Sequence, residues 1–135
     1  MSKVFADAYF YIAMLNRDDG HHVRVKQYLR ENADSIVTTR WVLAEVANAL
    51  SDVRFRATVA RFLQKLETDP GVNIIQSSDE LFQRGLKLYA SRPDKAWSLT
   101  DCISFIVMGD EKLQVALTGD RHFAQAGFIP LFVRA

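Results

Sequence analysis

Short apolar runs alternate with longer segments of helical periodicity along the whole chain. The segments spaced as helices lie at 8–15, 21–32, 40–50, 55–68, 78–90, 98–108 and 121–125. The apolar runs lie at 3–6, 36–38, 72–75, 115–118 and 129–133, and Pro130 restricts the last to an edge position. The alternation predicts an α/β fold with a mostly parallel central sheet of four to five short strands flanked by helices. Because no linker or repeat interrupts it, residues 1–135 are expected to form one domain.

The helix predicted at 98–108 is apolar on almost every side, which is typical of a buried helix. Asp101 nevertheless lies in its first turn, and a buried carboxylate is costly unless hydrogen bonds or a cation compensate it. Ser98 is a good N-cap, and Asp101 three residues later resembles the second member of a capping box. Capping alone would explain Asp101, so its interpretation depends on whether other acids reach the same place.

Three further acids are candidates for that place. Asp7 follows the first predicted strand, and Asp120 follows the fourth after one glycine. In an open parallel sheet, binding sites lie at the carboxyl ends of the strands, so Asp7, Asp101 and Asp120 are expected at one edge. Glu45 is the fourth candidate, although its helical pattern fits a solvated stripe equally well. Each acid alone also has a plain structural explanation, as a cap or a turn residue.

Carboxylates held close together repel one another and take up protons unless a cation lies between them. A site rich in carboxylate oxygens suits Mg²⁺ or Mn²⁺. Such ions activate water and neutralise charge during phosphodiester hydrolysis. Ser98 and Thr118 lie beside the predicted acids and are expected to support them by hydrogen bonding. The pattern therefore favours hydrolysis of a nucleic-acid backbone.

The composition restricts the setting of this chemistry. A net charge of +1 gives no global attraction to nucleic acid, so phosphate contacts must come from local basic residues. Cys102 is the single cysteine, which favours a reducing compartment. No secretion signal or bilayer-spanning apolar stretch is present, and the expected location is cytoplasmic, with no membrane partner. The basic residues expected near the acidic edge are Arg17, Arg40, Arg92, Lys95 and Arg121.

Four segments carry a resemblance that spans nearly the whole chain. They are Val4-Phe5-Ala6-Asp7, Thr39-Arg40-Trp41-Val42-Leu43-Ala44-Glu45, Ser98-Leu99-Thr100-Asp101 and Leu117-Thr118-Gly119-Asp120-Arg121-His122-Phe123. In order and approximate spacing they resemble PIN-domain ribonucleases, and among these the toxins of VapBC-type type II toxin–antitoxin systems. The resemblance implies an endoribonuclease that acts on RNA, forms a homodimer and is blocked by a cognate antitoxin. It also implies that the metal-binding and catalytic acids are Asp7, Glu45, Asp101 and Asp120.

One feature departs from that family, and two other functions stay open. Many members have a small hydroxyl residue soon after the first Asp, whereas Ala8-Tyr9-Phe10-Tyr11 follows Asp7 here. The alternatives are a non-catalytic PIN-like scaffold that binds RNA or protein, and a phosphoacceptor signalling domain. The signalling domain is disfavoured because it typically pairs two acids after the first strand, where Asp7 stands alone. His122 is interpreted as structural, with a substrate contact as the alternative because it is close to Asp120. Trp97 is interpreted as a core or rim residue, with base stacking as the alternative.

Overall fold

A single parallel sheet forms the centre of the molecule. The computed structural model describes residues 2–133. Within them the strand order is β3-β2-β1-β4-β5, and every neighbouring pair is parallel. Three successive residues of the central strand, Val4, Phe5 and Ala6, are buried, as a strand covered on both faces requires. The strands are β1 (Lys3–Ala6), β2 (Ser35–Thr39), β3 (Val72–Ile75), β4 (Val115–Leu117) and β5 (Ile129–Pro130).

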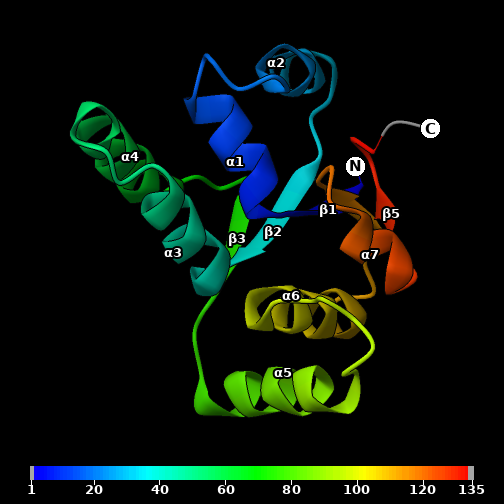
Figure 1. The fold of residues 1–135 in the computed structure, drawn as a ribbon. Helices are drawn as coiled ribbons and strands as arrows, with labels where there is room; N and C mark the ends of the chain where they lie inside the picture. The colour runs from blue at the N-terminus through cyan, green and yellow to red at the C-terminus, as the bar shows by residue number, and fades with distance from the viewer. Residues whose placement is uncertain (1, 134–135) are drawn as a thin grey trace.

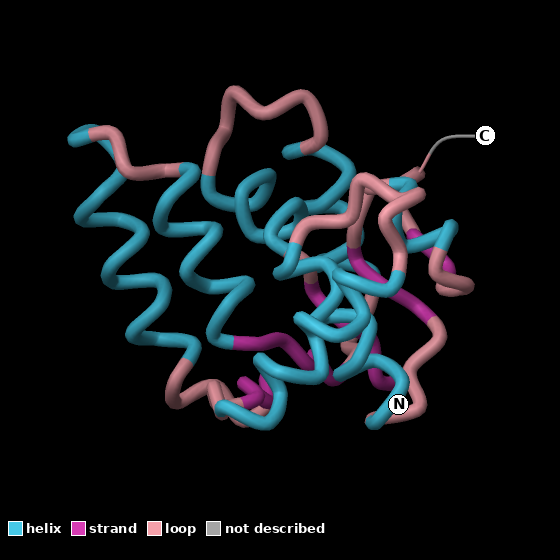
Figure 2. Tube along the Cα trace, turned by 60° about the horizontal axis from the view of Figure 1, so that its bottom comes forward, coloured by secondary structure: helices cyan, strands magenta, loops and turns pink. Residues whose placement is uncertain are grey.

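Helices cover both faces of the sheet, and Figure 2 shows the short strands among them. In the view of Figure 1, α1 and α2 lie above the strands, while α6 and then α5 lie below them. This division follows from right-handed crossovers, because the chain moves one way from β1 to β3 and the opposite way from β3 to β5. The helices are α1 (Ala8–Leu15), α2 (His22–Glu31), α3 (Arg40–Ala49), α4 (Val53–Leu66), α5 (Asp79–Ser91), α6 (Leu99–Asp110) and α7 (Arg121–Gln125).

The strand order places a topological switch point between β1 and β4. From β1 the chain adds β2 and β3 on one side, and then returns to add β4 and β5 on the other. The connections leaving β1 and β4 therefore diverge to opposite faces and leave a crevice at the carboxyl ends of these strands. Asp7 and Thr118 are the first residues after β1 and β4. The fold thus directs both residues to the position where ligands bind in open α/β sheets.

The predicted fold class is confirmed, and most of the predicted elements end within two residues of the observed ones. The strand expected at 129–133 is the exception, because regular strand structure ends at Pro130. Proline has no N–H for the ladder. The next two residues still donate backbone hydrogen bonds, from Leu131 to Ala116 of β4 and from Phe132 to Thr118 directly after it. No helix in residues 2–133 is long and apolar enough to cross a membrane.

The contact between α5 and α6 depends on Gly85. A Cβ built on this buried residue would collide with the Ile103 side chain and lie 3.4 Å from the Ile103 Cα. We expect Gly85→Ala to lower the free energy of unfolding by about 1 kcal/mol, because overpacking costs more than the gain in helix propensity returns. Chemical denaturation measures this. The matched control is Gly109→Ala in α6, where a Cβ meets nothing within 4 Å and a gain of roughly 0.5–1 kcal/mol is expected. Equal effects of the two substitutions would contradict this account of the packing.

Candidate functional site

Asp101 is held at the first turn of α6 by the predicted capping box. The Ser98 hydroxyl accepts the Asp101 backbone N–H at 2.9 Å, and Asp101 Oδ2 accepts the Ser98 backbone N–H at 3.1 Å. The carboxylate contact expected of Ser98 therefore comes from its amide, while its hydroxyl caps the helix. Asp101 is buried, and the N-terminal end of the helix favours its negative charge.

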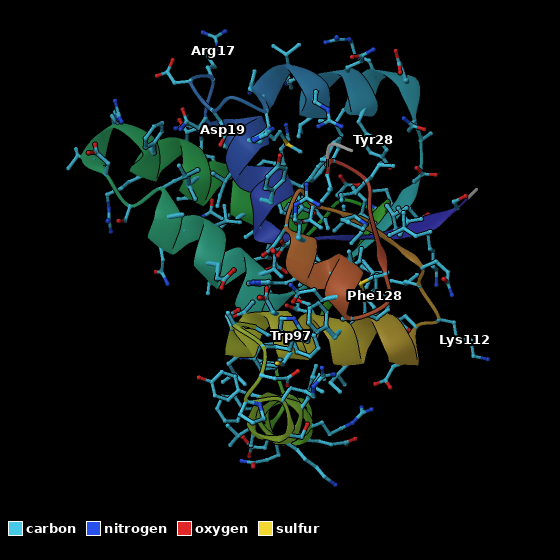
Figure 3. All side chains as sticks on the ribbon, turned by 45° about the vertical axis from the view of Figure 1, so that its right-hand side comes forward. Arg17, Asp19, Tyr28, Trp97, Lys112 and Phe128 are labelled. Atoms are coloured by element: carbon cyan, nitrogen blue, oxygen red, sulfur yellow. The ribbon has the colours of Figure 1, made fainter. Side chains whose placement is uncertain are left out.

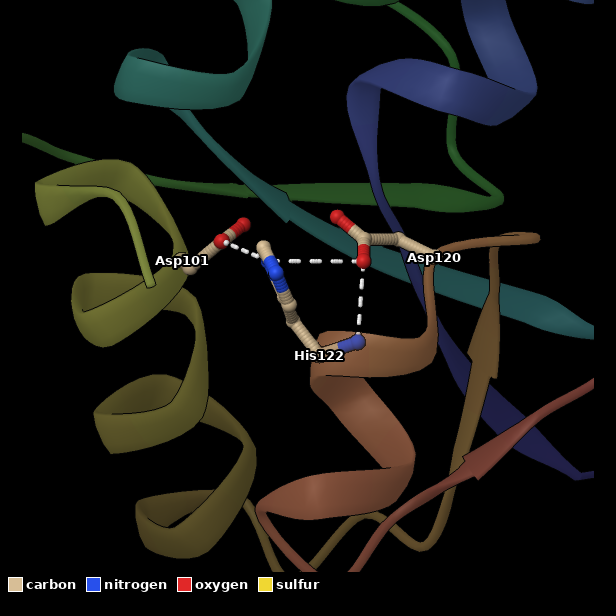
Figure 4. Close-up of side chains that lie close together, drawn as sticks. All are labelled: Asp101, Asp120 and His122. Carbon is tan, nitrogen blue, oxygen red and sulfur yellow. Dashed lines mark hydrogen bonds and ion pairs between the residues drawn. The ribbon is translucent and has the colours of Figure 1, made fainter. Parts of the chain in front are cut away.

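A histidine lies between two of the predicted acids, as Figure 4 shows. His122 Nδ1 lies 3.0 Å from Asp101 Oδ2 and 3.4 Å from Asp120 Oδ1. Asp120 also caps α7, because its Oδ1 accepts the His122 backbone N–H at 2.8 Å. One potential ligand atom from each of the three residues lies within 4.8 Å of the others. The sequence indicated that His122 is close to Asp120, but it did not identify the imidazole as a potential ligand beside Asp101 and Asp120.

Asp7 is tied to the neighbouring strand by one buried hydroxyl. Thr118 Oγ1 donates to Asp7 Oδ2 at 2.9 Å and accepts the Asp120 backbone N–H at 3.1 Å. Burial is the largest cause that raises the pKa of Asp7 to about 7, and the charges of Asp101 and Glu45 raise it further. The hydrogen bonds from Thr118 and from the Ala8 backbone oppose this rise. Thr118 thus supports an acid, as predicted, and positions Asp120 with the same hydroxyl group.

Glu45 reaches the same cluster from α3. Its pKa is raised, first by partial burial and then by the charges of Asp101 and Asp120, while a hydrogen bond with the Thr100 side chain lowers it. These charges place Glu45 near Asp101 and Asp120, which favours a clustered acid over one on a solvated stripe. The structure therefore brings together all four predicted acids, from the ends of β1 and β4, the start of α6 and the middle of α3.

The donor set of this site fits a divalent cation. Two of its carboxyl groups have raised pKa values because they are buried near further carboxylates, and a bound cation would remove that repulsion. Carboxylate oxygens are the ligands that suit Mg²⁺ and Mn²⁺, and one imidazole nitrogen adjoins them. In residues 2–133, the group of potential ligand atoms that lie within 4.8 Å of one another comes from Asp101, Asp120 and His122, and the charges that Asp7 and Glu45 experience place these two acids near it.

The predicted basic residues differ in their surroundings. Arg40 forms a two-pronged ion pair with Glu67, and Arg92 forms one with Asp94.

The expectation that Arg17 lies near the acids is wrong, because it follows the far end of α1, roughly 12 Å along the helix from Asp7. Figure 3 shows Arg17 at the top of the molecule, while Trp97 lies below the middle, beside α6. Arg121 begins α7 directly after Asp120, and Lys95 lies in the loop before α6.

Comparison with known proteins agrees with the fold. Residues 4–129 match the PIN domain family. The 23S rRNA-specific endonuclease VapC20, from two strains of Mycobacterium tuberculosis, is 27% identical over 127 residues, which cover 93% of this chain and 95% of that protein. The crystal structure of M. tuberculosis VapC20, described as a sarcin–ricin loop cleaving toxin, aligns with a TM-score of 0.86 at 23% identity over 95% of this chain and 98% of that one. The structure of FitAcB from Neisseria gonorrhoeae aligns with a TM-score of 0.64 at 14% identity, over 94% of each chain.

Proposed function

Because this chain belongs to the PIN domain family, we propose that it is a metal-dependent endoribonuclease and the toxin of a type II toxin–antitoxin pair. The observation that carries the proposal is the meeting of four acids at the switch point of the sheet, where burial raises the pKa of Asp7 to about 7. Burial of a carboxyl group beside three further acids costs the metal-free fold free energy, and a bound cation would offset that cost.

The catalytic ligands in this proposal are Asp7, Glu45, Asp101 and Asp120, and the ion they hold is Mg²⁺ or Mn²⁺. When bound, the ion supplies Lewis-acid activation of water and neutralises charge on the phosphodiester. The chain's own residues position the acids. Thr118 orients Asp7 and the Asp120 backbone through one hydroxyl, and the Ser98 amide orients Asp101. His122 contacts Asp101 and Asp120 and fixes the separation of their carboxyl groups.

The proposed substrate is RNA, and the proposed partners are a cognate antitoxin and a second copy of the chain. The relative with 27% identity is named as a 23S rRNA-specific endonuclease, which makes 23S rRNA the first substrate to test. An antitoxin that covers the acid cluster would silence the enzyme in the cell, and we place the complex in the cytoplasm. The toxin assignment predicts that expression alone arrests growth and that Asp101→Ala relieves the arrest.

The decisive experiment is an RNA cleavage assay on purified protein. Cleavage is expected with Mg²⁺ or Mn²⁺, is expected to stop when a chelator removes the ion, and is expected to return on re-addition. The inactive control is Asp101→Asn, which keeps an acceptor oxygen for the Ser98 amide but removes the charge. Cleavage by Asp101→Asn at the wild-type rate would remove the proposed mechanism. Failure to bind an ion with all four acids intact would favour a non-catalytic scaffold.

A further inference from the structure

We propose that a pocket beside the first turn of α6 receives an unpaired base of the RNA whose backbone crosses the acid cluster. The pocket lies between the end of α5, the loop 92–98 and the start of α6. This inference rests on the proposed function, since it assigns a substrate contact to the same site. It identifies Tyr89 as the residue on which that base stacks.

The pocket has the size and lining of a site for a planar group. Its volume is about 840 Å³, within the range of roughly 300–1,000 Å³ that is typical of small-molecule sites. Leu99 and Cys102 of α6 line one side, and Leu86 and Tyr89 of α5 line the other. Cys102 is fully buried, whereas the Tyr89 side chain is half exposed, with 50% of its surface accessible. The pocket thus has a buried apolar side and an exposed aromatic ring, the surface on which nucleic-acid bases stack.

A rigid turn brings positive charge to the same pocket. The Lys95 backbone N–H donates to the Arg92 carbonyl at 3.1 Å, which closes a turn with Pro93 at its second position. The Arg92 guanidinium lies 5.2 Å from the centre of the Trp97 ring and donates two 3.0 Å hydrogen bonds to Asp94. Asp94 offsets the charge of Arg92, so Lys95 supplies the net positive charge here. A guanidinium plane and an aromatic ring are surfaces on which a base stacks, and a lysine side chain contacts phosphate, so this combination suits a nucleotide.

Trp97 supports this pocket and is not its stacking surface. Only 6% of its surface is accessible, and its ring packs edge-on against Phe105 with centroids 5.0 Å apart. Its indole N–H donates to Gln125 at 3.0 Å, so its polar atom is already used inside the protein. The interpretation of Trp97 as a core or rim residue therefore agrees with its burial. The exposed aromatic residue that lines the pocket is Tyr89.

The pocket and the acid cluster share one residue. Ser98 lines the pocket, and its backbone N–H donates to the Asp101 carboxylate. Leu99 and Cys102 form one side of the first turn of α6, while Asp101 contacts His122 on another. At 3.6 residues per turn, Asp101 projects roughly 130° around the helix from the side that Leu99 and Cys102 form, so one helix diameter of about 10 Å separates the two sites. An RNA strand with its scissile phosphate at the acids would pass a nearby unpaired base over the pocket.

The test measures RNA binding in an Asp101→Asn background, which prevents cleavage. The probes are a fluorescein-labelled RNA hairpin with an unpaired loop and the same hairpin with single abasic positions in that loop. We expect Tyr89→Ala to weaken binding of the intact hairpin about tenfold, because loss of one stacked base has an effect of this order. The same substitution should leave binding of one abasic hairpin unchanged, since that RNA lacks the base in question.

Phe82 provides the matched control on the same helix. Phe82, Leu86 and Tyr89 form an exposed stripe on α5, with 36%, 39% and 50% of their surfaces accessible, but Phe82 does not line the pocket. Phe82→Ala should therefore change RNA binding less than twofold. If both substitutions instead shift the protein from dimer to monomer and leave RNA binding unchanged, the stripe is an interface between copies of the chain. That outcome would overturn the nucleotide assignment.

The charge on the pocket has a test of its own. Lys95→Ala should reduce by about one the slope of log binding constant against log salt concentration, since one phosphate contact is lost. Lys87→Ala removes an exposed charge from α5 outside the pocket and should leave the slope unchanged. Equal slopes for all three proteins would remove Lys95 from the pocket's function.

The pocket and the nuclease activity can fail separately. RNA cleavage by the wild-type protein, with Tyr89→Ala unchanged in both KM and RNA binding, would overturn the pocket and leave the nuclease intact. Binding that depends on Tyr89 in a protein that cleaves no RNA under any metal condition would support the pocket and remove the proposed catalysis. Failure to bind either hairpin would overturn the pocket.

Discussion

Replacement of Asp7 by Asn is expected to stabilise the metal-free protein at pH 8 while it removes RNA cleavage. In the folded protein the Asp7 carboxyl has a pKa of about 7, raised from an ordinary value of 3.8 mainly by burial. Ionisation of this group at pH 8 therefore costs the folded state about 4 kcal/mol, at 1.36 kcal/mol per pH unit. An uncharged side chain avoids that cost, and it also removes one of the four proposed ligands.

The sign of the effect follows from proton binding. Below pH 3.8 the Asp7 carboxyl is protonated in both the folded and the unfolded chain, and it causes no penalty. Between pH 3.8 and about 7 the unfolded chain releases the proton while the folded chain retains it, so stability falls as the pH rises. Above pH 7 the penalty is complete. The asparagine loses about 1 kcal/mol of this gain, since its NH₂ group accepts no hydrogen bond and one oxygen remains for both the Thr118 hydroxyl and the Ala8 N–H.

Urea denaturation in the presence of a chelator measures the result. We expect the Asp7→Asn variant to be more stable than the wild type by roughly 3 kcal/mol at pH 8, and no more stable at pH 4. Asp101→Asn is the matched control, because it also removes a proposed ligand but replaces the carboxylate that contacts His122, and it should not stabilise the protein. A stability gain for Asp7→Asn that is independent of pH would show that ionisation of Asp7 is not its cause.

The fold was predictable to a large extent because its local signals and its packing agree. The apolar run Val4-Phe5-Ala6 predicts a buried strand, and it forms the central strand of the sheet. The apolar pattern around Cys102 and Ile103 predicts a buried helix, and α5 covers that helix. The layering of α5 outside α6 was not predictable, because it depends on the fit of Gly85 against Ile103. Such a fit depends on the shapes of two segments that are distant in the sequence, and hydrophobic periodicity does not predict which segments fit together.

The candidate site was predictable only where topology determines it. Strand ends in a parallel sheet meet at one edge, which places Asp7 beside Asp120 without knowledge of any side-chain contact. Glu45 was undecided from its pattern, since only the approach of α3 to α6 distinguishes a clustered acid from a solvated one. The same holds for the predicted basic residues, because the Arg40–Glu67 ion pair joins positions 27 residues apart. Local sequence predicts which charges exist, whereas the tertiary fold determines which of them are paired.

Binding of a divalent ion is expected to depend on pH because Asp7 must release its proton. With a pKa of about 7, Asp7 is protonated in about nine-tenths of metal-free molecules at pH 6 and about one-tenth at pH 8. The affinity for Mn²⁺ or Mg²⁺ should therefore fall about tenfold from pH 8 to pH 6, and each ion bound at pH 7 should release about half a proton. The raised pKa of Glu45 acts in the same direction.

Isothermal titration calorimetry in two buffers of different ionisation enthalpy measures both the affinity and the released protons. The Asp7→Asn variant is the control, because it has no proton to release at this position and should show a weaker but flatter dependence of affinity on pH. The thermal midpoint of the wild type should rise more on addition of the ion at pH 8 than at pH 6, since only the ionised site gains the full attraction. An affinity that is constant from pH 6 to pH 8 would mean that the ion binds without Asp7, and would leave the buried carboxyl group without its proposed function.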